Sequence, residues 1–343
     1  MQPILVIKFG TASITDQNGN PEPETLSRIA RQVSDLRNLY RIVLVSSGAV
    51  GAGKQFISGY KGELGQKKAA AAVGNPILMA LYSREFAKHE VAVAQSLCER
   101  GHFANRNQFL QLKNTYQTLW DSGIIPIANE NDVVSDVELK FSDNDELATL
   151  LAAGFGADVL MFSTSVGGLL DKEGKIVPLV NKIDHDVWSL VDQSKSSLGL
   201  GGMLSKLSFA RRANQLGIKV VIFSAREEGS ISKALGGESG TQFLPQKVNR
   251  SLRQKWLSTG TLISAYVVVD EGAATALKAR KSLLAVGVRI IDGEFEEGEV
   301  IGMRSESGEE IAVGRAKTSS AFLSQNLKTK KLEVAHADDI VIL

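Results

Sequence analysis

Short apolar runs alternate with longer amphipathic segments through most of the chain. The apolar runs predict strands at residues 4–10, 41–45, 124–128, 159–163 and 220–223. Apolar positions at helical spacing predict helices at residues 27–40, 67–73, 76–89, 106–120, 145–154 and 204–216. Strands that alternate with helices over about 250 residues predict an α/β fold, a mostly parallel sheet sandwiched by helices.

The pattern changes near residue 260, where short strands at 266–270, 286–291, 299–304 and 310–313 follow one another. Turn dipeptides separate these strands, and short helices are expected at 272–280 and 319–325. The tail is therefore expected to be a small, β-rich second domain. We expect domain limits of 1–255 and 262–343, with the linker within residues 250–261.

Composition supports two domains and narrows the class of protein. At 343 residues, the chain is longer than a domain with a single hydrophobic core usually is. Its one cysteine, Cys98, excludes an intramolecular disulfide and fits a reducing cytoplasm. The four histidines are scattered, so no zinc site is expected. Neither a leader segment nor an apolar run of about 18 residues is evident, so we expect a cytoplasmic protein without membrane contact.

Net charge argues against a nucleic-acid partner. The whole chain carries +1, and residues 261–343 hold ten Lys/Arg against thirteen Asp/Glu, a net of −3. Binding to a phosphate backbone normally needs a basic surface. An RNA-binding module is thus the less favoured alternative to an enzyme.

Carboxylates, amides and a lysine cluster where predicted strands end. Lys8 ends the first strand, Ser46–Gly48 follow the second, and Asn129–Asp132 follow the third. Parallel strands place such ends along one edge of the sheet, so these groups can converge. Simpler interpretations stay open, because Lys8 could reach solvent along its stem and Asp132 and Asn144 could be turn or cap residues.

A glycine-rich turn, 199–206, runs into the predicted helix at 204–216 and ends in Lys206. Glycines there let backbone N–H groups approach phosphate oxygens, and the helix N-terminus adds positive potential. A flexible turn is the alternative. Together with the acidic and amide cluster, the turn indicates phosphoryl transfer to a small polar acceptor.

A second glycine-rich segment, 48–54, matches the spacing of a P-loop but is not expected to be one. Gln55 stands where a P-loop has the Ser or Thr that holds Mg²⁺. We expect Ser46–Gly48 instead to offer N–H groups and a hydroxyl to a small anion.

These segments, in this order, resemble the amino acid kinase family, and within it the members that phosphorylate glutamate. The resemblance spans nearly the whole chain and rests on residues 6–13, 45–50, 71–74, 126–132, 143–145 and 201–206. The tail resembles the PUA domain found on many of these members, through residues 269–273 and 281–284.

The resemblance implies transfer of the ATP γ-phosphoryl group to the side-chain carboxylate of L-glutamate, giving L-glutamyl 5-phosphate. It implies catalytic roles for Lys8, Lys206 and Asp145, with Asp145 orienting the lysines. It also implies two sets of ligand-binding residues. For glutamate they are Ser47, Asp132 and Asn144; for ATP they are Lys8, Thr164, Ser165, Leu200, Gly201, Gly202, Met203, Leu204, Ser205 and Lys206.

Two positions depart from the family on the nucleotide side. Ser165 stands where many members have Asp, and Leu200 stands where a small or polar Thr is usual. No protein metal site is expected, and Mg²⁺ would arrive with ATP, held by phosphates and water.

The resemblance further implies the first step of proline biosynthesis, proline as feedback inhibitor, a glutamyl-phosphate reductase as downstream partner and a homo-oligomer. A family member acting on acetylglutamate, aspartate, carbamate or a nucleoside monophosphate is the alternative within kinases.

Overall fold

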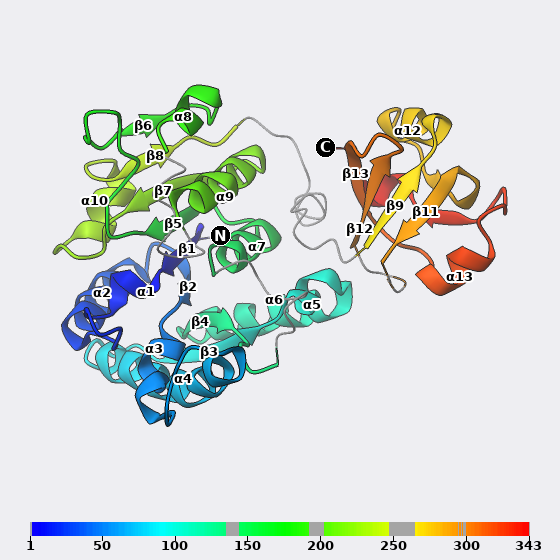
Figure 1. Ribbon diagram of the computed structural model, residues 1–343. Helices are drawn as coiled ribbons and strands as arrows, with labels where there is room; N and C mark the ends of the chain where they lie inside the picture. Colours follow the sequence, from blue (N-terminus) through cyan, green and yellow to red (C-terminus); the bar gives the residue numbers. More distant parts are fainter. Residues whose placement is uncertain are drawn as a thin grey trace. The chain divides into compact units, whose positions relative to one another are not determined.

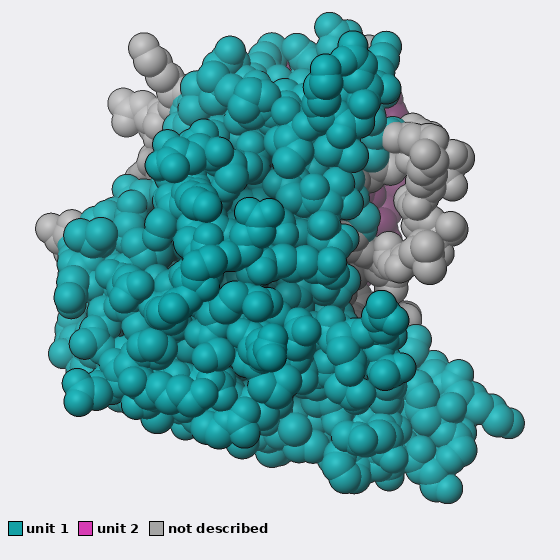
Figure 2. Space-filling model, turned by 90° about the vertical axis from the view of Figure 1, so that its left-hand side faces the viewer, with its two compact units in different colours: residues 1–99, 114–249 teal, residues 100–113, 250–343 magenta. Residues whose placement is uncertain are grey.

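The computed structural model describes residues 2–134, 144–191, 202–246, 265–293, 295, 297 and 300–342. The chain divides into two compact units, coloured separately in Figure 2. The first comprises residues 1–99 and 114–249, and the second comprises residues 100–113 and 250–343. The sequence pattern gave no reason to expect residues 100–113 in the second unit. The expected linker at 250–261 lies outside the described residues.

Unit 1 is built on an eight-stranded sheet in the order β3-β4-β2-β1-β5-β7-β8-β6 (Figure 1). The pairs from β3 through β7 are parallel, while β8 runs antiparallel to β7 and parallel to β6. The mostly parallel sheet predicted from sequence is confirmed. The strands are β1 (Ile4–Phe9), β2 (Arg41–Ser46), β3 (Val93–Cys98), β4 (Ile125–Glu130), β5 (Val159–Ser163), β6 (Leu179–Val180), β7 (Lys219–Phe223) and β8 (Thr241–Phe243).

Helices cover both faces of this sheet (Figure 1). One apolar core joins α2, α4 and α10 to the strands, and α7 and α9 pack on the strands from the other side. The helices that the structure describes before residue 247 are α1 (Thr11–Ile14), α2 (Pro23–Leu36), α3 (Ala49–Gly53), η1 (Lys54–Phe56), α4 (Leu64–Ala87), α5 (Arg100–Ala104), α6 (Arg106–Asp121), α7 (Asn144–Phe155), α8 (His185–Ser189), α9 (Met203–Gln215) and α10 (Ser230–Gly236).

Helix α4 corrects one prediction, because it is a single helix of 24 residues where two were expected. Pro76 lies inside it and removes one backbone donor. The helix nevertheless continues, since Leu78, Tyr82 and Phe86 on the following turns are buried in the core. Burial of these side chains outweighs the cost of the proline.

The P-loop-like segment folds as α3 and the short η1, and its glycines serve close packing. A Cβ atom built on Gly53 would lie 1.9 Å from the Ala70 carbonyl oxygen in α4, and one on Gly74 would lie 1.8 Å from the Ala49 oxygen. The Lys54 ammonium group donates to the backbone oxygen of Asn18. In the structure, residues 49–56 are therefore helical, and the glycines of this segment allow α3 to pack closely on α4.

Unit 2 contains a five-stranded sheet in the order β11-β9-β12-β13-β15 and a two-stranded sheet, β10-β14. Its own core includes Val267, Val269, Ile301, Met303 and Phe295. The expected β-rich character is confirmed. Its elements are β9 (Ala265–Val269), α12 (Glu271–Lys278), β10 (Leu283–Leu284), η3 (Ala285–Gly287), β11 (Val288–Asp292), β12 (Val300–Ser305), β13 (Glu310–Arg315), α13 (Ser320–Gln325), β14 (Glu333–Ala335), η4 (Ala337–Asp339) and β15 (Ile340–Ile342).

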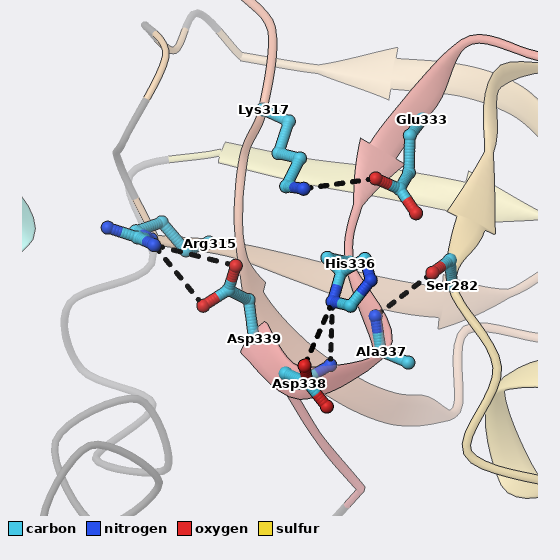
Figure 3. Close-up of polar contacts among 8 residues, drawn as sticks. All are labelled: Ser282, Arg315, Lys317, Glu333, His336, Ala337, Asp338 and Asp339. Atoms are coloured by element: carbon cyan, nitrogen blue, oxygen red, sulfur yellow. Dashed lines mark hydrogen bonds and ion pairs between the residues drawn. The ribbon is translucent and has the colours of Figure 1, made fainter.

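Polar pairs join the last elements of unit 2 (Figure 3). Arg315 reaches Asp339 at 3.3 Å, and Lys317 reaches Glu333 at 3.1 Å. The Asp339 side chain is buried, whereas Lys317 and Glu333 are both partly exposed. The exposed pair therefore contributes little to stability, and the Arg315–Asp339 pair matters more.

Within the described part of the chain, no helix is long and apolar enough to cross a bilayer.

Candidate active site

Lys8 is buried in the middle of the sheet, although it carries a charge. Residues 5, 7 and 9 of β1 belong to the core shared with α2 and α4. Side chains alternate across a strand, so Lys8 points to the opposite face, where α7 packs. Only 4% of Lys8 is exposed, so the alternative in which it reaches solvent does not hold.

Asp145 receives both lysines predicted to be catalytic. Its Oδ1 lies 2.5 Å from the Lys8 Nζ, and its Oδ2 accepts from the Lys206 Nζ at 2.9 Å. The Asp145 side chain is fully buried, in the first turn of α7, where a carboxylate interacts favourably with the helix dipole. Lys206 lies in the first turn of α9, whose N-cap is Gly202. Three segments far apart in sequence thus meet at one point.

The three charges sum to +1 in a site shielded from water. Charge–charge interactions are stronger there than at the surface, and a paired carboxylate keeps both ammonium groups in place. Such a group of donors suits an anion that gains charge as it reacts, such as a phosphoryl group in transfer.

A second polar cluster contains two of the predicted glutamate-binding residues. The Asn144 Nδ2 donates to the Ser47 Oγ at 3.0 Å and to the Asn129 Oδ1 at 2.9 Å. Asn144 directly precedes Asp145 in α7, and Ser47 directly follows β2, where its N–H donates to the Phe9 carbonyl. The carboxyl ends of β1, β2 and β4 therefore converge as the sequence predicted.

Sequence reasoning missed two polar residues that support this cluster, Asn75 and Tyr82, both of which lie on α4. Asn75 and Asn129 are both 5% exposed and bonded to each other at 3.0 Å, and the Ser46 Oγ lies 2.9 Å from the Tyr82 hydroxyl. Burial raises the pKa of Tyr82 well above its ordinary range, so its hydroxyl stays protonated. Asn75 could have been suspected only because an Asn precedes a proline within an apolar helix.

The remaining predicted residues lie on the surrounding loops. Asp132 follows β4 and is partly exposed. Thr164 follows β5, where its N–H donates to the Phe223 carbonyl and its hydroxyl accepts from the Val166 N–H. Ser165 is exposed.

The glycine-rich turn is only partly described. Gly202, Met203 and Ser205 begin α9. Leu200 and Gly201 lie outside the described residues, and so does the Leu204 side chain. Of the predicted phosphate-binding segment, the structure therefore describes only residues 202–206, which include the start of α9 and Lys206.

The described residues contain no cluster of three or more side chains suited to hold a metal ion. Asp145 does not fit such a role, because each of its oxygens faces a lysine.

The fold is that of a known class of small-molecule phosphotransferases, the kinases of carboxylates and related acids. The chain belongs to the amino acid kinase family, which it matches over residues 3–224, and it carries a PUA domain at residues 265–337.

Curated relatives that match nearly the whole chain are named glutamate 5-kinases. The Moorella thermoacetica protein is 36% identical, over 99% of this chain and 96% of its own length. The Geobacter metallireducens protein is 34% identical, over 99% of this chain and 97% of its own length. The Nostoc punctiforme protein is 36% identical, over 95% of this chain and 92% of its own length.

Among solved structures, carbamate kinase from Giardia lamblia bound to AMP-PNP aligns with a TM-score of 0.51. It covers 71% of this chain and 99% of its own, at 18% sequence identity. The same enzyme bound to citric acid also aligns with a TM-score of 0.51. At this identity the likeness demonstrates the shared fold.

Proposed function

We propose that this protein transfers the γ-phosphoryl group of ATP to the side-chain carboxylate of L-glutamate, giving L-glutamyl 5-phosphate. The observation that carries the proposal is the buried Lys8–Asp145–Lys206 group, beside the Asn144–Ser47 pair. Full-length similarity to glutamate 5-kinases supports glutamate as the acceptor over carbamate or other family substrates.

The proposed reaction needs no general base. A glutamate side chain has a reference pKa of about 4.3, so its carboxylate is already ionised near neutral pH. Catalysis then depends on alignment and on stabilising the charge of the moving phosphoryl group. Lys8 and Lys206 supply that positive charge, and Asp145 orients them.

Substrate binding is assigned to two sides of this group. We assign the glutamate to Ser47, Asn144 and Asp132, the last because a carboxylate suits the α-ammonium group. We assign ATP to Lys8, Lys206 and the segments at 164–165 and 200–205. Mg²⁺ would be held mainly by the nucleotide phosphates and water, since no described carboxylate is free to ligate it in the lysine group.

The proposed biological setting is the first step of proline biosynthesis in the cytoplasm. The product is an acyl phosphate, which hydrolyses readily, so direct use by a glutamyl-phosphate reductase fits its chemistry. Proline is the proposed feedback inhibitor, and a homo-oligomer is the proposed assembly. We propose 1–255 as the catalytic domain and 262–343 as the PUA-like domain.

The test is ATP consumption that depends on glutamate, with the acyl phosphate trapped by hydroxylamine as the hydroxamate. Hydroxamate should form with glutamate, and aspartate, acetylglutamate and carbamate should give little ATP turnover. The Lys206→Ala variant should lose about 100- to 1,000-fold in kcat while it stays folded. ATP turnover with another acceptor of the panel, and none with glutamate, would refute the proposal.

A further inference from the structure

Three hydrogen-bonded amides, of which Asn75 and Asn129 are buried and Asn144 is half-buried, link helix α4 to the acceptor side of the site. The Asn129 Nδ2 donates to the Asn75 Oδ1 at 3.0 Å, and the Asn144 Nδ2 donates to the Asn129 Oδ1 at 2.9 Å. Asn75 comes from α4, Asn129 from β4 and Asn144 from α7. The linked amides thus reach a proposed substrate-binding residue from a helix that supplies none of the lysine–aspartate group.

Contacts to backbone groups show which way the amides of Asn129 and Asn144 face. The Glu130 N–H donates to the Asn129 side chain at 2.9 Å, so the atom of Asn129 it meets must be the oxygen. The other atom of Asn129 is then the NH₂ group, and it needs an acceptor, which Asn75 provides. Without that acceptor, Asn129 would keep a buried donor unpaired, a state that costs free energy and favours reorientation.

The same logic determines what Asn144 can offer to a ligand. Its Nδ2 faces the Asn129 Oδ1, the Ser47 Oγ and, at 3.4 Å, the Ser46 carbonyl oxygen, which can only accept. Its Oδ1 is buried and has no hydrogen-bond partner among the described residues. A buried carbonyl oxygen without a donor is suited to an incoming N–H group and repels a carboxylate.

We propose that Asn75 is a positioning residue that acts through Asn129 to hold the Asn144 carbonyl oxygen toward the ammonium group of the acceptor substrate. The inference rests on the proposed function and adds a basis for substrate choice. The Asn144 carbonyl oxygen accepts a hydrogen bond from the ammonium group of the amino acid substrate. The Ser47 hydroxyl remains able to donate to one of its carboxylates. An acceptor that lacks an ammonium group would leave the Asn144 oxygen buried and unpaired.

The experiment compares glutamate with glutarate, which has both carboxylates but no ammonium group. The readout is the ratio of kcat/KM for glutamate to that for glutarate; if glutarate turns over too slowly, its Ki against glutamate replaces the second value. Asn75→Leu removes the acceptor at similar volume, and we expect the ratio to fall about tenfold, as expected for a weakened bond to a charged group. The KM for ATP should stay within about twofold, since the lysine group is untouched.

The matched variant is Asn75→Asp, which keeps an acceptor oxygen at the same position and should retain most of the wild-type ratio. A second control is the Asn144→Ala background, in which Asn75→Leu should lower the ratio no further. If Asn75→Leu fails to fold, as judged by its thermal melt, Asn75→Ala takes its place in the comparison.

A purely structural role for Asn75 would lower activity on both substrates equally and leave the ratio unchanged, which would overturn the proposal. The proposal would also be overturned if folded Asn75→Asp lowered the glutamate-to-glutarate ratio of kcat/KM as much as Asn75→Leu does. Absence of glutamate turnover in the wild-type protein would instead refute the proposed function, and this inference with it. Wild-type turnover with an unchanged ratio in Asn75→Leu refutes the positioning role alone.

Discussion

Replacing Asp145 by asparagine tests the electrostatic account of the site most directly. The change keeps the shape of the side chain but removes the negative charge that Lys8 contacts at 2.5 Å and Lys206 at 2.9 Å. One amide oxygen can still accept from one lysine, whereas the new NH₂ group faces the ammonium group of the other. The negative charge that both buried ammonium groups contact is therefore lost.

The expected effects are large because the charges are shielded from water. The exposed fractions of the Lys8, Lys206 and Asp145 side chains are 6%, 9% and 0%. Breaking a buried ion pair by removing one partner typically costs about 3–5 kcal/mol. For a domain of this size that corresponds to a fall in Tm of roughly 6–20 °C. Loss of lysine alignment should lower kcat by at least about 100-fold.

The assay pairs calorimetric unfolding with hydroxamate formation, and a double variant separates the two effects. Asp145→Asn with Lys206→Met also removes one of the two ammonium charges, so Tm should recover partly while kcat stays low. Asp158→Asn is the matched control, because Asp158 is exposed and its Oδ2 accepts only a backbone bond, from Ile4, among its described contacts. An Asp145→Asn protein with wild-type Tm and kcat would refute the reasoning, as would a double variant less stable than the single one.

Three other features of the chain give predictions of their own. Gly53→Ala should lower Tm by several degrees or prevent folding, because its Cβ would lie 1.9 Å from the Ala70 oxygen. The control is Gly65→Ala, at the start of α4, where no atom lies within 4 Å of the added Cβ; this change should leave Tm unchanged or raise it. Burial raises the pKa of Cys98 to about 11, so at pH 8 the thiol should stay protonated and react with a disulfide reagent only after unfolding in guanidinium, as thiol titration will report. A chain ended at Leu257 should retain kcat within about threefold in the hydroxamate assay, because every residue proposed to act in catalysis precedes residue 210; folded but inactive protein would contradict this.

Local pattern was enough to predict most of unit 1. The apolar runs that became β1, β2, β4, β5 and β7 are bounded by clear turns, and their alternation with helices implies a parallel sheet. Sequence reasoning did not find β3, whose run Val-Ala-Gln-Ser-Leu-Cys mixes polar and apolar residues because it lies at the sheet edge and is partly exposed. It also predicted two helices, divided near Pro76, in place of α4. Local helix propensity does not include the tertiary packing against the core that stabilises the continuous helix.

The sequence by itself determined which kinds of groups lie at the strand ends and in the glycine-rich turn. Family likeness singled out five site residues: Lys8, Ser47, Asn144, Asp145 and Lys206. Family likeness also implied that Asp145 orients both lysines. Only the tertiary structure decided which oxygen of Asp145 contacts which lysine, and that Asn75 accepts a hydrogen bond from Asn129. The physical reason is that charge pairing and amide orientation are short-range and directional, while the partners are 54 to 137 residues apart along the chain. The sequence shows which residue types are present and where they lie along the chain. The packing of α4, α7 and α9 decides which of their side-chain atoms form hydrogen bonds and ion pairs.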